Sequence, residues 1–256
     1  MAIHVGIGGW DFDPWRGTFY PQGLAKTKQL HFASRQLSAI EINATFYKLQ
    51  RPELFAGWRD AVPDGFKFAI KGSRFCTNRK ILADGGEAIG RFCAQGMTEL
   101  GDKLGPILWQ FADTKKFDSD DVAGFLKLLP RSQDGVTLRH VVEARHESFR
   151  DPRFAALARE AGVAICYVEG EGKPAFPEQT ADFTYARLMN ASEAEPNGFA
   201  QAELDRIADL ARGWADGGRR EVFMFFISGA KVRNPAAAKA LIERLGGLRT
   251  AAPALS

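Results

Sequence analysis

Short runs of apolar residues alternate along the chain with segments whose apolar positions recur at helical spacing. Such alternation is typical of a parallel sheet built from strand–helix–strand units. The pattern predicts eight strands, the number that closes a (β/α)8 barrel of the TIM type. We place them at Ile3–Gly8, Ser38–Asn43, Phe66–Lys71, Leu104–Gln110, Leu138–Ala144, Val163–Val168, Phe183–Leu188 and Val222–Ile227.

Helix signals occupy most of the intervening segments. Pro52 stands where the first residue of a helix would stand, and Pro63 ends that helix. The segment 169–181 is rich in Gly, Pro and Glu, so we expect an irregular connection there, between the sixth and seventh strands. The same signals predict helices over Glu87–Leu100, from a Ser119 cap to Leu129, from Asp151-Pro152 to Gly162, over Glu203–Ala215 and from Asn234-Pro235 onward.

The fold class is therefore predicted to be α/β, with a single barrel domain over residues 1–256. An open, doubly wound sheet is the alternative. Against it, no Gly-x-Gly-x-x-Gly opens a helix after the first strand, and eight strands exceed the usual number for such a sheet.

Polar side chains interrupt these apolar strands close to their carboxyl ends, where the working residues of TIM barrels lie. Because side chains alternate along a strand, Ile40 and Ile42 face the helices, and Glu41 then faces the barrel interior. A charge inside an apolar strand costs several kcal/mol unless it is paired or solvated. Groups that converge at one level can satisfy one another and also form a ligand site. We therefore predict a polar pocket that contains Glu41, Asn43, Lys71, Gln110, Glu143, Arg145, His146 and Arg187.

Each residue type in this pocket indicates a role. Two carboxylates, Glu41 and Glu143, can serve as general acid and base where their environments separate their pKa values. Cationic Lys71, Arg145 and Arg187 can hold a phosphate or a carboxylate. The alternative is a structural network with pairs such as Glu41–Lys71 or Glu143–Arg145. The aromatic first loop adds Trp10, directly after its strand, as a residue that could stack on a ring-shaped ligand.

Composition narrows the class of partner. The 256 residues carry a net charge of +3, a mild excess that fits a small anionic ligand and leaves nucleic acid as an alternative. Three cysteines without a CxxC pair indicate free thiols and a cytoplasmic location. We expect no membrane partner, because no basic and apolar leader and no apolar run of membrane-spanning length is evident. The oligomeric state is left open.

Metal chemistry has little support in the sequence. The four histidines form no HxH or HExxH spacing, and only His146 lies near a predicted strand end. A site made of His146, Glu143 and Glu41 is conceivable but disfavoured, so we assign no metal. The sequence leaves the cofactor unknown.

Several stretches together resemble a known family. They are Gly9-Trp10 through Trp15-Arg16-Gly17, Phe19-Tyr20-Pro21, residues 41–47 (EINATFY), 66–71 (FKFAIK), 104–110 (LGPILWQ) and 143–149 (EARHESF). They look like the YecE-like family, a domain-of-unknown-function family (number seventy-two), and the resemblance covers nearly the whole chain. It implies a TIM barrel, and it implies no established activity.

Departures from that family pattern lie mostly in the second half of the chain. The third loop has Thr77-Asn78 where the family usually has Thr-His, and the sixth strand ends in Cys166-Tyr167-Val168 without the usual Asp. Met189-Asn190 and Ser228-Gly229 replace polar groups of the seventh and eighth strands. The resemblance therefore implies either a divergent subgroup with different ligand contacts or a member in which a family activity is weakened.

Three functions remain open from the sequence. The first is an uncharacterised barrel that binds or transforms a small phosphate- or nucleotide-like anion by carboxylate acid–base chemistry. The second is a non-catalytic barrel that binds nucleic acid or another ligand. The third is a structural salt-bridge network, in which both carboxylates would be fully paired and inaccessible.

Overall fold

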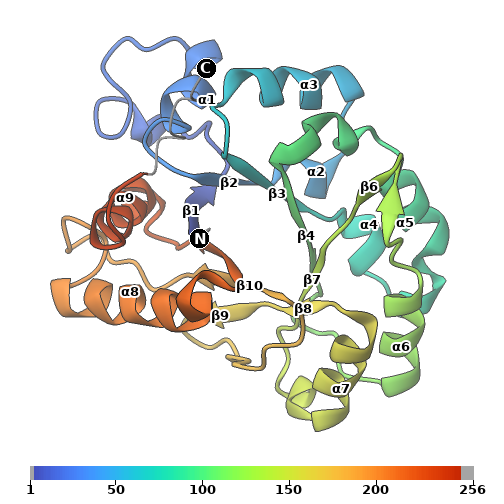
Figure 1. Cartoon of the computed structure of the whole chain (residues 1–256). Helices are drawn as coiled ribbons and strands as arrows, with labels where there is room; N and C mark the ends of the chain where they lie inside the picture. The colour runs from blue at the N-terminus through green and yellow to red at the C-terminus, as the bar shows by residue number, and fades with distance from the viewer. Residues whose placement is uncertain (1–2, 249–256) are drawn as a thin grey trace.

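The predicted strands form one parallel sheet that curls into a ring in the computed structural model, which describes residues 3–248 (Figure 1). Neighbouring strands around the ring follow the order β8-β7-β4-β3-β2-β1-β11-β10-β9. Their bounds are β1 Ile3–Gly8, β2 Ala39–Ile42, β3 Lys67–Lys71, β4 Leu104–Gln110, β7 His140–Glu143, β8 Ala164–Ile165, β9 Tyr167–Glu169, β10 Phe183–Leu188 and β11 Glu221–Phe226.

The ring closes at its sixth position. Strands β8 and β9 correspond to the single strand predicted as the sixth, and only Cys166 separates them. The first half pairs with β7 and the second with β10, while the Cys166 backbone N–H donates to the Val142 carbonyl at 2.9 Å. The chain therefore forms a (β/α)8 barrel, and the predicted fold class is confirmed. The single domain predicted over 1–256 includes terminal residues that lie outside the described range.

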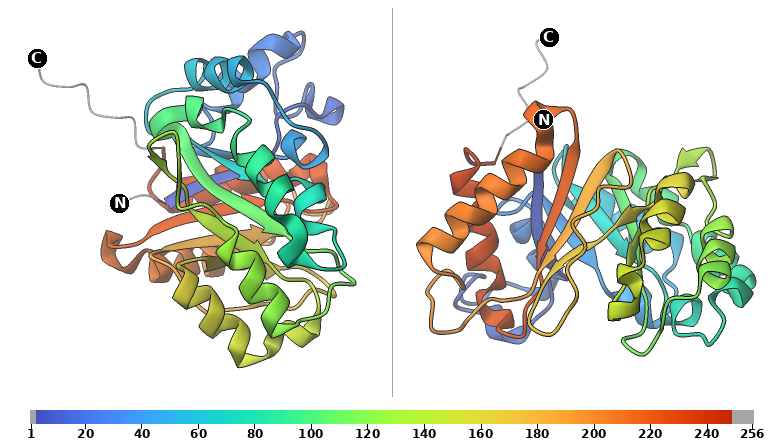
Figure 2. Two further views of the ribbon diagram at one scale, coloured as in Figure 1. Left: turned by 90° about the vertical axis from the view of Figure 1, so that its right-hand side faces the viewer. Right: turned by 90° about the horizontal axis from the view of Figure 1, so that it is seen from below.

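Helices lie outside the ring of strands (Figures 1 and 2). Within residues 3–248, the connection between β9 and β10 carries no helix, as its Gly and Pro content predicted. None of the helices in this part of the chain is both long and apolar enough to cross a membrane. The α-helices are α1 Gln29–Ala33, α2 Ala44–Tyr47, α3 Pro52–Ala61, α4 Arg74–Thr77, α5 Gly86–Cys93, α6 Ser119–Lys127, α7 Pro152–Ala161, α8 Gln201–Ala215 and α9 Asn234–Arg244.

Two predicted helix boundaries were wrong. The helix predicted over Glu87–Leu100 ends at Cys93, because Gly96 adopts a left-handed φ of 94° and the chain continues as a 3-10 helix, Met97–Lys103. Both α5 and this 3-10 helix bury apolar side chains, so the apolar spacing in the sequence continues across Gly96 and did not reveal the break. The cap of α6 is Asp118, whose carboxylate accepts from the backbone N–H groups of the second and third helical residues. Ser119 is the first helical residue.

Two short antiparallel strands were not predicted. They are β5 Ser132–Gln133 and β6 Val136–Thr137, which pair across Asp134-Gly135. Both turn residues have positive φ, 48° and 76°. Asp-Gly is a recognised hairpin signal, but its flanking strands are too short to show alternation.

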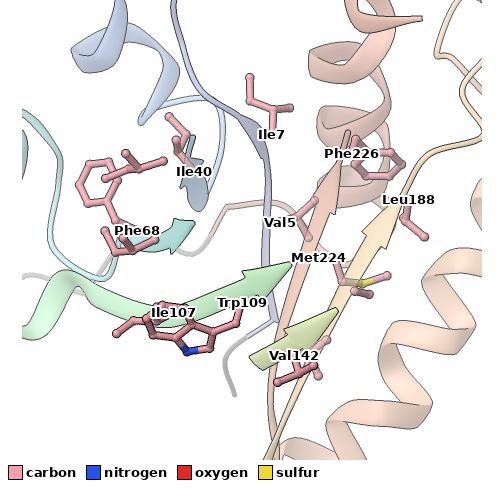
Figure 3. Packing of buried hydrophobic residues seen from close by; sticks show 14 of the residues in the cluster. Val5, Ile7, Ile40, Phe68, Ile107, Trp109, Val142, Leu188, Met224 and Phe226 are labelled. Atoms are coloured by element: carbon pink, nitrogen blue, oxygen red, sulfur yellow. The ribbon is translucent and has the colours of Figure 1, made fainter. Parts of the chain in front are cut away.

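The apolar core lies on both faces of the sheet. Side chains such as Ile40, Phe68 and Trp109 pack between the strands and the helices (Figure 3). A second cluster fills the barrel interior, and its members alternate with the first along each strand. Small interior residues come from β2 and β3, namely Ala39 and Ala69, whereas β10 and β11 contribute large rings, namely Phe183, Tyr185, Phe223 and Phe225. Side chains from the β10 side therefore reach across toward β2.

Gly6 of β1 provides a test of this tight packing. A Cβ added there would lie 1.9 Å from the backbone carbonyl oxygen of Ala39, so the neighbouring strand would have to move. We expect Gly6→Ala to lower the free energy of unfolding by about 2–4 kcal/mol in urea denaturation. Gly57→Ala is the control, since nothing lies within 4 Å of an added Cβ there. Because Gly57 lies inside α3, its replacement should stabilise by up to about 1 kcal/mol. Equal effects of the two variants would contradict this account.

Candidate functional site

Three charged side chains meet inside the carboxyl end of the barrel. Glu41 is the next-to-last residue of β2, Glu143 ends β7, and Arg187 projects from β10. The Arg187 Nη1 donates to Glu143 Oε2 at 2.6 Å, and its Nη2 donates to Glu41 Oε1 at 3.1 Å. Both carboxylates are fully buried, and the guanidinium is 2% exposed. One arginine therefore joins two carboxylates that come from opposite sides of the ring.

Neutral donors complete the hydrogen bonding of these carboxylates. The Tyr185 hydroxyl donates to Glu41 Oε2 at 2.7 Å, and the Gln110 amide donates to Glu143 Oε1 at 3.2 Å. Arg145 adds a second cation at Glu143, with its Nε 2.5 Å from Oε1. The Glu143–Arg145 pair, which the structural alternative named, is therefore present. The alternative pair Glu41–Lys71 does not form, because Arg187 takes that place at Glu41.

The electrostatics of this cluster keep its members in defined protonation states. Burial favours the neutral form of Glu143, but Arg187 and Arg145 outweigh burial and lower its pKa. Burial, and then the Glu41 carboxylate, raise the pKa of Tyr185 well above its ordinary value. Tyr185 therefore remains protonated and donates to Glu41, while Glu143 remains ionised at neutral pH.

Lys71 differs from the other cations of the site. It ends β3 and is half-buried, and its Nζ lies 4.4 Å from the centroid of the Phe46 ring. Within residues 3–248, the ammonium forms no ion pair with a carboxylate. Burial and the positive charge of Arg187 lower the pKa of Lys71 to about 8, and the more distant Glu41 and Glu143 offset this only in part. A fraction of this amine is therefore neutral near physiological pH.

An outer ion pair connects the buried network to a hollow at the same end of the barrel. Arg145 Nη1 donates to Asp113 Oδ1 at 3.1 Å, and Lys173 Nζ donates to Asp113 Oδ2 at 3.2 Å. Lys173 also lines an open hollow of about 720 Å³ formed by segments after β9, β10 and β11. Met189 and Asn190 line the same hollow.

The remaining predicted residues, Asn43, Trp10 and His146, have three different environments. Asn43 lies at the barrel mouth, where its Nδ2 would be 2.8 Å from a Cβ on Gly8, so the glycine makes room for the amide. Trp10 is not brought into the cluster, because its ring packs edge-on against Trp58 of α3 at 5.3 Å. His146 caps a short 3-10 helix, with its Nδ1 accepting from the Ser148 backbone N–H at 3.1 Å.

The sequence prediction missed Tyr185, Asp113 and Lys173. Strand alternation could have found Tyr185, because it lies two residues before Arg187 on the same inward face of β10. Asp113 and Lys173 belong to irregular segments after β4 and β9, where alternation predicts no direction.

The four positions that depart from the family pattern lie apart from the carboxylate cluster. Asn78 is exposed, Tyr167 donates to Glu169 at 3.0 Å, and the Ser228 hydroxyl is 2.6 Å from Asn234 Oδ1. Met189 lines the open hollow. No group of three or more His, Cys, Asp or Glu side chains within residues 3–248 is arranged to hold a metal ion.

Comparison with known proteins identifies the family. The model described as protein of unknown function DUF72 matches residues 4–255. The chain belongs to the DUF72 family. The UPF0759 protein YecE of Escherichia coli K12 is 23% identical over 127 residues, which is 44% of this chain and 44% of YecE. The match thus spans less than half of that relative's length.

Solved structures of DUF72 proteins share the fold. A DUF72 family protein from Thermotoga maritima superimposes with a TM-score of 0.73 at 22% identity, covering 94% of this chain and 97% of the other. A DUF72 family protein from Enterococcus faecalis V583 gives 0.70 at 21% identity, covering 97% of each chain. At these identities the likeness concerns the fold alone.

Removing the bridging cation tests the carboxylate network. We expect Arg187→Met to lower the free energy of unfolding at pH 7 by about 3–5 kcal/mol, because two carboxylates are then buried without their shared partner. Urea denaturation at several pH values measures this change. The control is Arg212→Met, which removes a half-exposed partner of Asp209 on α8 and should cost at most about 1 kcal/mol.

The pH dependence of that difference has a defined sign. In the native network the pKa of Glu143 is lowered, so its contribution to stability is present above its ordinary pKa and is lost as pH falls. In Arg187→Met the cation that opposes the effect of burial is missing, so burial raises the pKa of the Glu143 carboxylate. Protonation of Glu143 at lower pH then removes the buried charge, and the variant regains stability. The stability difference should therefore shrink from pH 7 to pH 5. A constant difference would contradict the network.

Proposed function

We propose that the mouth of the barrel binds a small phosphate- or nucleotide-like anion and transforms it by proton transfer at Lys71. The observation that carries this proposal is the unpaired ammonium of Lys71 beside a buried network in which Arg187 pairs with both carboxylates. Its position at the carboxyl end of a strand is the usual location of working groups in TIM barrels.

The charges around Lys71 support an anionic ligand. The connected ion pairs match three carboxylates, Glu41, Glu143 and Asp113, with three cations, Arg145, Lys173 and Arg187. Lys71 is the cation left over, so these seven groups together carry a net charge of +1. A ligand phosphate would supply the missing counter-charge.

The geometry favours a revised division of roles. Full burial and pairing with Arg187 leave Glu41 and Glu143 without a face toward a ligand. We assign them to fixing Arg187 and to setting the electrostatic environment of Lys71, in place of direct acid–base action. The half-buried Nζ of Lys71 holds or releases the proton, and Arg145, which retains some exposure, is the second group available to the anion.

The acidity of Lys71 can be measured without any ligand. Cyanate carbamylates only the neutral amine, so the rate of Lys71 modification against pH, followed by peptide mass spectrometry, reports its pKa. We expect a midpoint at about 8, whereas a lysine-containing reference peptide in the same solution should titrate near about 10.4. A Lys71 midpoint close to that of the reference peptide would remove the basis for proton transfer here.

Ligand binding is tested with inorganic phosphate and adenosine 5′-monophosphate in thermal-shift titrations. A bound anion raises the melting temperature in proportion to the logarithm of its concentration above Kd. We expect Lys71→Gln to weaken binding about tenfold or more, since it removes the unpaired charge. Native affinity should fall as pH rises through about 8, where Lys71 loses its proton.

The matched control for that titration is Lys127→Gln, an exposed lysine on α6 away from the barrel mouth. It should leave the affinity unchanged. Equal loss in both variants, or no shift with either probe in the native protein, would contradict an anion site at Lys71.

A further inference from the structure

Exposed apolar side chains are concentrated on one part of the surface. Six large apolar residues in the described chain are notably exposed, and four of them lie within residues 43–51 and 71–81. Tyr47 is 62% exposed and Phe75 is 60% exposed. Water-exposed rings of this size are unfavourable in an isolated monomer, so their clustering indicates a contact surface.

The same two segments carry an unusual charge. The whole chain is nearly balanced, with 34 basic and 31 acidic residues, but residues 43–51 and 71–81 contain no Asp or Glu at all. None of their cations forms an ion pair within residues 3–248. These cations are Lys48, Arg51, Lys71, Arg74, Arg79 and Lys80.

Arg74 joins the two exposed rings. Its guanidinium carbon lies 5.9 Å from the centroid of Tyr47 on α2 and 5.4 Å from that of Phe75 on α4. Arg74 thus links two rings that 28 positions separate in the sequence. Flat faces and an unpaired guanidinium are placed together at the carboxyl end of β2 and β3.

We propose that this surface, formed by residues 43–51 and 71–81 and here called the α2–α4 surface, binds single-stranded DNA. Aromatic rings stack on unpaired bases of any identity, and unpaired cations contact the phosphates that follow along the strand. A duplex offers few free base faces to such rings. The α2–α4 surface extends beyond the small-anion site proposed at Lys71, because its central residues, Tyr47, Arg74 and Phe75, are not part of that site.

The experiment measures fluorescence anisotropy of a labelled oligo-dT of about twelve nucleotides, within the usual site size of single-strand binders. We expect Tyr47→Ala and Phe75→Ala each to weaken binding about tenfold, while Leu54→Ala, which truncates an exposed apolar residue on α3, has no effect. All three positions are exposed, so unchanged melting temperatures should verify that the variants fold. Equal affinity for an abasic oligomer of the same length would overturn base stacking.

The salt dependence tests the cations separately. Each phosphate contact with single-stranded nucleic acid adds about 0.7 to the slope of log Kd against log salt concentration. Arg74→Gln should reduce the slope by about that amount, and Lys127→Gln should leave it unchanged. A native slope near zero would overturn the proposal.

Competing occupants give distinct outcomes. Tighter binding to duplex DNA or to oligo-U than to oligo-dT would overturn the assignment to single-stranded DNA. So would binding to phosphatidylserine–phosphatidylcholine vesicles that depends on Phe75 while oligo-dT binding does not. Failure of phosphate binding at Lys71 with retained, ring-dependent oligo-dT binding would refute the small-anion proposal and leave this one intact.

Discussion

The arrangement at the barrel mouth depends on one buried guanidinium. Arg187 reaches from β10 across the barrel interior and donates to carboxylates on β2 and β7. Without it, Glu41 and Glu143 would be two like charges in a region filled by apolar side chains, which is strongly unfavourable. The rest of the interior is apolar, with small residues Ala39 and Ala69 on β2 and β3 and large rings on β10 and β11.

A closed network and an open site coexist at this end of the barrel. The sequence left a structural network and a ligand pocket as alternatives. In the structure, some of these residues belong to a closed network and others remain unpaired. Glu41 and Glu143 are buried and paired, as the structural alternative expects. Lys71 is not paired, and burial together with the charge of Arg187 lowers its pKa to about 8. The network therefore creates the environment in which a lysine can exchange a proton near neutrality.

Position along the strands connects the network to the exposed surface. Glu41 lies one residue before the end of β2 and Lys71 ends β3. The short helices α2 and α4, which carry Tyr47 and Arg74, follow these strands within a few residues. In a parallel barrel all strand ends emerge at the same rim. Buried charges, the unpaired lysine and the exposed rings are consequently arranged from the interior outward on neighbouring units of the barrel.

The sequence by itself determined the eight strands of the barrel, their alternation with helices, and the inward direction of Glu41, Lys71, Gln110 and Glu143. Local alternation and helix signals carry this information, because each depends on a few neighbouring residues. Alternation ends where a strand ends, so it did not show that Trp10, which follows Gly9 with its positive φ of 71°, packs against Trp58. Only the tertiary structure decided that Arg187, and not Lys71, pairs with Glu41, because β2 and β10 face each other only once the barrel has closed.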